Sequence, residues 1–243
     1  LTKLNPNVFK YYCLEKNENN NICSIKLNDY QLKFLSLSSN TKLVKLNILL
    51  ENDYYLHSKE QFLFQYLQIL IVKYHSLTWE KPFIICQYLK QIKIHLKNHW
   101  DLVDLLNSLP IVEKVESTID YDVNSCRDNC LLKKNSYSNK LIYFSYEIHS
   151  NNGLVYFVTD YTIIESLIKQ FQNLLKLRLY IIGCINTTID GYHLENNLFK
   201  YLPKLNEFDL FIQSYGGYEF KSMDQFSSFK WNFACYTNYL TDM

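Results

Sequence analysis

A short hydrophobic pattern recurs along the chain, and it limits the possible folds more than any other feature of the sequence. The pattern is Leu-x-x-Leu-x-Leu, in which other aliphatic or aromatic residues replace leucine in several copies. It predicts a strand whose apolar residues at positions 1, 4 and 6 point into one core. Eight copies begin at Ile22, Leu43, Leu67, Leu89, Val112, Leu141, Leu174 and Leu205.

The spacing of the copies is nearly regular in the first half of the chain. Successive copies start 21, 24, 22, 23, 29, 33 and 31 residues apart. The first four intervals fit a structural repeat of about 20–29 residues, the fifth lies at its edge, and the last two require inserted residues. The Val112 copy is imperfect because Ser117 occupies its sixth position. The spacing therefore predicts a stack of similar units, each adding one strand to a shared core.

The segments before three of the strands support the same phase. Apolar residues stand seven and three positions ahead of the strand in the pairs Leu105/Leu109, Leu167/Phe171 and Leu198/Leu202. A gap of four residues places both members of a pair on one face of a helix. We therefore expect each pair to lie on a helix that packs against the strand layer.

Prolines and capping sequences indicate where these helices end and begin. Pro110 and Pro203 each stand two residues before a strand, where a helix must end. Thr162-x-x-Glu165 predicts a capping box that opens the helix before Leu174, and Ser58-x-x-Gln61 predicts another before Leu67.

The blocks LVKLNI, LLKLRL, IESLIKQFQNLLKLRLYI and LENNLFKYLPKLNEFDLFI resemble leucine-rich repeats over roughly Ile22 to Ile212. The junctions at Leu109–Val112 and Leu202–Leu205 resemble the degenerate repeats of F-box-type substrate receptors of ubiquitin ligases. This resemblance implies an α/β solenoid, a horseshoe with parallel strands on the concave side and helices on the convex side. No F-box-like helical module precedes Ile22, so a ligase adaptor would have to bind through a further N-terminal module.

The chain departs from that resemblance at the turn after each strand. The asparagine or cysteine usual eight residues after the first leucine is absent, so the polar groups of the turn must be satisfied in another way. The residues in that place are Tyr30, Glu51, His75, Lys97, Asp120, His149, Ile182 and Gln213.

The repeats suggest three parts along the chain. Residues 1–21 form an N-terminal lead-in or cap, residues 22–213 hold about eight repeats, and residues 214–243 form an aromatic cap over the last strand edge. An ordinary α/β domain is the alternative fold. A Rossmann-like sheet is disfavoured because no glycine-rich turn follows any strand.

The expected binding surface consists of strand residues that alternate with the buried ones. The fifth position of successive copies forms a row that includes Asn47, Ile71 and Ser145, and neighbouring positions lie on the same face. Tyrosine and arginine are enriched at interface hot spots, which favours the C-terminal half. The alternative is that these residues are only solvated strand positions. The candidate protein-binding residues of the concave face are Lys93, His95, Glu116, Tyr143, Arg178, Tyr180, Asp209 and Phe211.

The composition argues against several classes of partner. The 25 basic and 24 acidic residues leave a net charge of +1, which disfavours nucleic-acid binding. No apolar run reaches the about 18 residues of a membrane span, so no membrane association is expected. The seven cysteines are odd in number and do not form a disulfide framework, so a cytoplasmic or nuclear location is expected.

The sequence contains no set of residues that indicates a metal, a cofactor or catalysis. Cys126 and Cys130 would need two further zinc ligands, and free cysteines in a loop explain them more simply. His95 and His99 are four residues apart, but we expect them at a strand end and in the following turn, where they do not share a helix face. No Ser/His/Asp set, Cys/His set or phosphate-binding loop is apparent, so the chain is not expected to be an enzyme.

The function expected from these observations is binding of a protein ligand. The more specific form is the substrate-recognition part of an F-box-type ubiquitin ligase receptor, which follows from the resemblance alone. The alternatives are a structural or scaffolding repeat protein without ligase association and, least favoured, an enzyme with an α/β fold.

Overall fold

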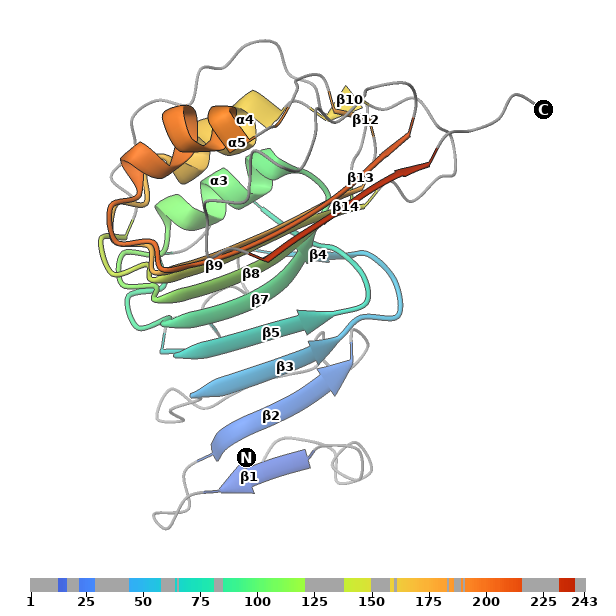
Figure 1. Cartoon of the computed structure of the whole chain (residues 1–243). Coiled ribbons are helices and arrows are strands. Elements are labelled where there is room, and N and C mark those ends of the chain that lie inside the picture. Colours follow the sequence, from blue (N-terminus) through green and yellow to red (C-terminus); the bar gives the residue numbers. More distant parts are fainter. Residues whose placement is uncertain are drawn as a thin grey trace, which may run out of the picture. The chain divides into compact units, whose positions relative to one another are not determined.

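A computed structural model describes most of the repeat region of the chain. The described residues are 13–16, 22–28, 44–57, 64, 66–80, 85–120, 138–149, 158–159, 161–182, 184–185, 189, 191–215 and 232–238. Contacts between Cα atoms divide the chain into two compact units, Leu1–Ser117 and Thr118–Met243. The structure is mixed α/β, and its main strands are mostly parallel (Figure 1).

The first unit contains a run of neighbouring strands. The order is β1 (Cys13–Lys16), β2 (Ile22–Asn28), β3 (Lys45–Leu49), β5 (Ile69–Lys73), β7 (Gln91–Leu96) and the first part of β8 (Lys114–Asp120). β1 is antiparallel to β2, whereas β2, β3, β5 and β7 pair in parallel. Beyond the main strands, β4 (Tyr54–Leu56) and β6 (Leu77–Trp79) form a small parallel pair, and α3 (His99–Asn107) follows β7.

The second unit repeats this organisation. The strands β9 (Tyr143–His149), β11 (Lys176–Ile182), β13 (Glu207–Tyr215) and β14 (Asn232–Asn238) are parallel neighbours. β10 (Val158–Thr159) and β12 (Cys184–Ile185) form a second small parallel pair. The helical segments are α4 (Tyr161–Ile168), α5 (Gly191–His193), the π-helix η4 (Leu194–Leu198) and the 3₁₀ turn η5 (Phe199–Tyr201).

Each of the eight copies of the hydrophobic pattern contributes a strand, as the sequence predicts, and in every copy except the first the strand begins at the third residue. Backbone hydrogen bonds recur in the same phase in several copies. The first residue of a copy donates its N–H to the carbonyl three residues earlier, as Leu67 does to Phe64 and Leu174 does to Phe171. The second and third residues both donate to one carbonyl of the preceding copy. These acceptors are Val44, Gln68, Lys90, Ile142 and Leu175. The copies that begin at Leu67, Leu89, Leu174 and Leu205 show both features, and the Val112 and Leu141 copies each show one of them.

The core lies on the strand face formed by the fourth and sixth positions, because side chains alternate between the two faces of a strand. Ser117, the imperfect sixth position, is buried there at 3% exposure. In the second unit, Phe171 packs on this face, with its ring centroid 5.0 Å from that of Phe144. The other buried positions of this face include Leu46, Ile48, Leu70, Val72, Ile92, Ile94, Tyr146, Leu177, Leu179, Phe208 and Leu210.

The apolar pairs before the strands are buried, but the prediction that each pair lies on one helix is wrong. Leu105 belongs to α3, whereas Leu109 follows the helix, which ends at Asn107. Leu167 and Phe171 are divided in the same way by the end of α4 at Ile168. The chain turns tightly at these points, as the N–H of Phe171 donates to the carbonyl of Ile168. The third pair, Leu198 and Leu202, likewise stands on either side of η5.

The helix starts also differ in part from the prediction. The Thr162 capping box is wrong, because α4 begins at Tyr161 and Thr162 is therefore already inside the helix. The second proposed box, Ser58-x-x-Gln61, lies outside the described residues. The cap that the structure shows is Asn98, whose Oδ1 accepts a hydrogen bond of 2.9 Å from the N–H of Asp101 at the start of α3.

Pro110 and Pro203 stand in the turns between helix and strand, as predicted. The C-terminal segment expected as a cap contributes β14, which pairs in parallel with β13 and continues the sheet of the second unit. No helix among the described residues is both long and apolar enough to cross a membrane.

Candidate functional site

The second unit carries three rows of side chains on the strand face opposite to the one that packs against Phe171. We call this the outer face. Parallel pairing without a register shift brings corresponding positions of β9, β11 and β13 side by side. The first row is Tyr143, Lys176 and Glu207, the second is Ser145, Arg178 and Asp209, and the third is Glu147, Tyr180 and Phe211.

The third row contains a stacked aromatic pair. The rings of Tyr180 and Phe211 have centroids 4.1 Å apart and an angle of 6° between their planes. Both side chains are half-buried, so the pair presents apolar ring surface to solvent. The pair exists because Tyr180 and Phe211 are direct register partners. Aromatic rings also lose little conformational entropy when a ligand covers them.

The second row contains an ion pair next to the aromatic rings. Arg178 Nε lies 2.6 Å from Asp209 Oδ2, and the Arg178 side chain remains half exposed. The hydrogen bond with Asp209 raises the pKa of Arg178, partial burial opposes this, and Tyr143 adds to the increase. Lys176 of the first row forms a corresponding ion pair with Glu207. The cations of the outer face are therefore held by carboxylates on the neighbouring strand.

The predicted residues of the first unit form a separate charged group. Lys93 Nζ lies 2.9 Å from Glu116 Oε2, and Lys114 Nζ lies 2.7 Å from Glu116 Oε1. Burial by itself would raise the pKa of Glu116, but the two lysines outweigh it and hold the pKa below its usual value. His95 is half-buried two residues after Lys93 on β7. Asn47, Ile71 and Lys93 are aligned by the strand register, as expected of the fifth position.

The structure thus divides the eight predicted binding residues between the two units. It brings Lys93 together with Glu116 in the first. In the second it brings together the remaining partners, Tyr143, Arg178, Tyr180, Asp209 and Phe211. Alternation places both rings of the aromatic stack on the outer face, because they occupy the seventh position of their copies, and the parallel register of β11 and β13 brings them together.

The turns of the first unit are held by a polar group that the sequence analysis did not identify. Asp53 Oδ1 accepts hydrogen bonds from the N–H of Ser76 at 3.1 Å and from its hydroxyl at 2.7 Å. Asp53 Oδ2 lies 3.0 Å from Lys97 Nζ. Burial would raise the pKa of Asp53, but Ser76 and Lys97 outweigh it and lower the pKa. These side chains occupy the turns that follow β3, β5 and β7.

Replacing Asp53 by alanine is expected to lower the free energy of unfolding by about 1–2 kcal/mol near neutral pH, because the fully buried Ser76 loses its acceptor. The pKa of Asp53 is lower in the folded protein, so its contribution is fully present above the unfolded value and is lost as the pH falls through the folded value. Urea unfolding should therefore show a difference from wild type that shrinks on acidification below pH 3.8. A difference independent of pH would contradict this role.

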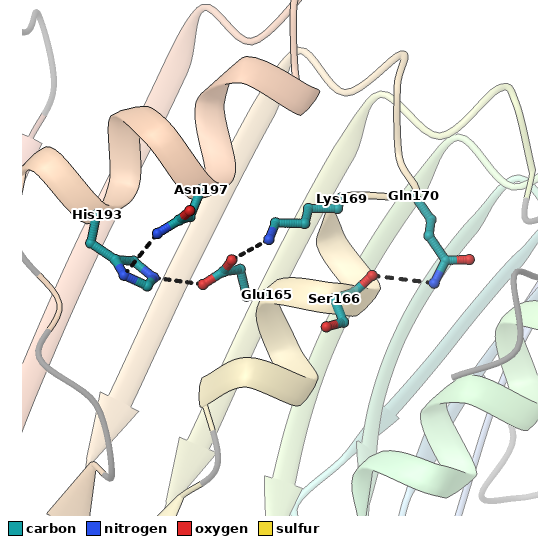
Figure 2. Close-up of polar contacts among 6 residues, drawn as sticks. All are labelled: Glu165, Ser166, Lys169, Gln170, His193 and Asn197. Carbon is teal, nitrogen blue, oxygen red and sulfur yellow. Dashed lines mark hydrogen bonds and ion pairs between the residues drawn. The ribbon is translucent and has the colours of Figure 1, made fainter. Parts of the chain in front are cut away.

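A second group that the sequence did not reveal surrounds Glu165 on α4. Figure 2 shows His193 and Lys169 directed at the Glu165 carboxylate from two sides. Glu165 is 6% exposed, and its Oε2 lies 2.6 Å from His193 Nε2. The other ring nitrogen, Nδ1, lies 3.1 Å from Asn197 Nδ2. Burial and the Glu165 charge together raise the pKa of the adjacent Tyr161.

This buried group holds two helical segments together, and we call it the Glu165 clasp. Both nitrogens of the His193 ring are engaged by neighbouring side chains, so the arrangement uses the imidazole to join α4 to the segment α5–η4. The spacing of four between His193 and Asn197 is helical and could have suggested their proximity, but nothing local connects them to Glu165.

The described residues also bear on metal binding and thiol chemistry. His95 lies near the end of β7, as expected, but the prediction that His99 lies in the following turn is wrong, because His99 is the first residue of α3. The two histidines therefore do not share a helix face. Among the described residues no three histidine, cysteine or acidic side chains are grouped as metal ligands. Burial raises the pKa of the Cys86 thiol to about 12, which keeps it protonated. Cys126 and Cys130 lie outside the described residues.

Comparison with known proteins adds no family assignment. No protein-family model matches the sequence, and no curated protein is significantly similar to it. Function must therefore be inferred from the residues and contacts of the two units.

Proposed function

We propose that the chain is a protein-binding module of the leucine-rich-repeat class, and that the outer face of the second unit contacts the protein ligand. The observation that carries the proposal is the stacked, half-exposed pair Tyr180 and Phe211. Tyrosine is enriched at interface hot spots because its ring supplies a large contact area with few rotatable bonds.

The surroundings of the aromatic pair suit a binding role. Arg178 is held by Asp209, so its orientation is set before a ligand arrives. A binding site whose side chains are already ordered loses less entropy on association. Tyr143 contributes a further aromatic residue in the first row beside Lys176. The outer face therefore combines ordered polar groups with an apolar centre, as in the core and rim of protein interfaces.

The proposal includes a solenoid horseshoe whose concave side carries these strands. Its support is the recurrence of the same backbone hydrogen bonds in the Leu67, Leu89, Leu174 and Leu205 copies, which is expected of stacked repeats. In this arrangement Lys93, His95 and Glu116 provide the corresponding face of the first unit. We propose that these three residues contact a protein ligand through the strand face of the first unit itself.

The narrower form of the proposal is that the chain is the substrate-recognition part of an F-box-type ubiquitin ligase receptor. Its support is the resemblance of the Leu-Pro-containing junctions, both of which occupy turns after helical segments. Leu109, Val112 and Leu202 of these junctions are buried, whereas both prolines are exposed. The ligase adaptor would bind through an N-terminal module beyond these residues, and the protein ligand of the outer face would be the substrate.

Replacing Tyr180 by alanine in the full-length protein is expected to weaken binding of the ligand by about tenfold or more, because half of the aromatic stack is lost. The measurement is affinity capture from the source cell with wild type and variant, followed by quantitative mass spectrometry. In the narrower form, a ligase adaptor and a cullin are captured by both proteins, whereas the substrate is lost from the variant.

The matched control is Tyr192→Ala, which removes an exposed tyrosine from α5, away from the outer face. It should leave the captured proteins unchanged. If Tyr180→Ala and Phe211→Ala each retain every partner that wild type captures, the outer face is not the binding surface. That result would favour a structural or scaffolding role.

A further inference from the structure

The turns that precede β9, β11 and β13 carry lysines but no acidic residues. We call these turns the turn edge, and it consists of residues 138–142, 169–175 and 199–206. Backbone hydrogen bonds join neighbouring turns, because the N–H of Leu175 donates to the Ile142 carbonyl and that of Asn206 donates to the Leu175 carbonyl. The turn edge is therefore positively charged, although the whole chain has a net charge of only +1. Its lysines are Lys140, Lys169, Lys200 and Lys204.

An ion pair within the protein neutralises one of these lysines. Lys169 is directed at the buried Glu165 carboxylate of the clasp (Figure 2). Lys140, Lys200 and Lys204 are exposed, and none of them forms an ion pair with a residue that the structure describes. Three cations of the turn edge are thus available to a negatively charged partner.

Uncharged groups orient two of these three cations. Lys204 Nζ donates a hydrogen bond of 2.6 Å to Asn173 Oδ1, and Asn173 Nδ2 donates one of 2.7 Å to the Asn139 carbonyl. Lys200 Nζ lies 5.0 Å from the centroid of the exposed Tyr201 ring. Because an amide and an aromatic ring carry no net charge, each ammonium group keeps its attraction for a carboxylate.

The turn edge also exposes apolar side chains between its lysines. Ile142 is 42% exposed and Leu175 is 37% exposed, and they occupy the second position of neighbouring copies. Lys140 and Lys204 each stand directly before a copy, on the two strands that flank β11. Strand spacing places the backbones of these two lysines about 10 Å apart. Exposed aliphatic groups thus lie within a stretch bounded by two cations.

We propose that the turn edge binds an acidic segment of a partner protein, whose carboxylates pair with Lys140 and Lys204 and whose aliphatic side chains cover Ile142 and Leu175. The turn edge uses residues other than those of the outer face, so the inference goes beyond the proposed function and does not depend on it. Charge complementarity identifies the partner, because its carboxylates supply the missing anions. Burial of the two aliphatic side chains adds a hydrophobic contribution. A nucleic acid would offer phosphates to the lysines but no aliphatic group to the apolar pair.

The test starts by panning a library of random displayed peptides on the full chain carrying Tyr180→Ala, which removes half of the aromatic stack from the outer face. Peptides bound by this variant should be enriched in aspartate or glutamate together with leucine, isoleucine or valine. The most enriched peptide is then synthesised with a fluorescent label, and an amide copy carries asparagine and glutamine in place of its acids. We expect the amide copy to bind about tenfold more weakly in anisotropy titrations, because its pairs with the lysines are lost.

The charge contact is tested by the double variant Lys140→Gln and Lys204→Gln. Its matched control is the double variant Lys45→Gln and Lys73→Gln, which removes the same charge from β3 and β5 of the first unit. Neither control lysine forms an ion pair with the described residues. The turn-edge variant should weaken the acidic peptide about five- to tenfold and barely affect the amide copy, whereas the control should change neither. Comparing the two peptides separates the charge contact from any change in folding.

The apolar contact is tested by the double variant Ile142→Ala and Leu175→Ala. It should weaken the acidic peptide and the amide copy by the same factor, about three- to tenfold, because both peptides keep their aliphatic side chains. Tyr192→Ala is the control, since it removes an exposed ring from α5 and should leave both affinities unchanged. A single-stranded DNA oligonucleotide of mixed sequence, added at physiological ionic strength, should not displace the acidic peptide.

Four results would overturn the inference. The first is a panned set without acidic peptides, and the second is an equal loss of affinity in the two lysine double variants. The third is an acidic peptide that binds the Ile142→Ala and Leu175→Ala variant as tightly as the chain without these changes. The fourth is displacement by the oligonucleotide, which would replace the acidic protein segment by a nucleic acid. The outer-face proposal is tested by other residues and stands or falls separately.

Discussion

Replacing Phe171 by alanine is expected to lower the free energy of unfolding by about 3–5 kcal/mol. Phe171 is 2% exposed and lies in the turn between α4 and β11. Its ring contacts that of the fully buried Phe144 on β9 at a centroid distance of 5.0 Å. Removing the ring would leave a cavity between the helix layer and the strands, and the main chain there cannot close it. The turn is held by two backbone hydrogen bonds, from Phe171 N–H to Ile168 and from Leu174 N–H to Phe171.

The measurement is urea unfolding followed by circular dichroism. Leu175→Ala is the control, because Leu175 lies four residues further along and is 37% exposed. Leu175→Ala should lower the free energy of unfolding by less than about 1 kcal/mol, since water already reaches much of the side chain. If both variants lost the same stability, Phe171 would not act as the link between the helical segment and the strand core.

Replacing Glu165 by alanine is expected to lower the free energy of unfolding by about 3 kcal/mol. The carboxylate is nearly fully buried, and it accepts the hydrogen bond of His193 and pairs with Lys169. Its loss would leave two basic side chains, both mostly buried, without their acceptor. The expected loss of unfolding free energy is at the lower end of the range for buried ion pairs, because Lys169 and His193 both retain partial contact with water.

The conservative variant Glu165→Gln keeps one oxygen acceptor and should lose about half as much stability. Glu195→Ala is the control, because Glu195 is an exposed acid on η4, in the segment that the clasp joins to α4. The free energy of unfolding of Glu195→Ala should stay within about 0.5 kcal/mol of the wild-type value. Hydrogen exchange would add a local measurement, with faster exchange expected in α5 and η4 for Glu165→Ala. Unaltered exchange there would contradict the role of Glu165 as a clasp.

The strands and the outer face could be predicted because their information is local and repeated. The residues of LVKLNI and LLKLRL alternate between apolar and polar, and this alternation assigns each side chain to one of two faces. Equal phase in neighbouring copies then brings Arg178 to Asp209 and Tyr180 to Phe211 without further assumption. The binding role of that face stays a prediction, because the same geometry also suits solvated strand residues.

The ends of the helices, unlike the strands, could not be predicted from the sequence. Leu167 and Phe171 are both buried. Two residues spaced four apart can be buried on the same side either when both lie on one helix or when the second lies in the turn after the helix, as Phe171 does. Spacing alone does not distinguish these two arrangements. The capping interpretation of Thr162 failed for a related reason, since Glu165 is drawn to His193 and Lys169 rather than to the start of its own helix.

The positions of the strands and the identity of the residues on the outer face follow from the sequence, because each segment carries the same short period of apolar and polar residues. The contacts that join segments of unrelated sequence follow instead from the path of the chain in three dimensions. Asp53 meets Ser76 over 23 residues, and Glu165 meets His193 over 28 residues. Polar side chains such as these have several possible partners, and the chain path selects one by bringing it within hydrogen-bond distance while excluding water. The direct stack of Tyr180 on Phe211 depends on both: periodicity supplies the rings, and the parallel register sets them face to face.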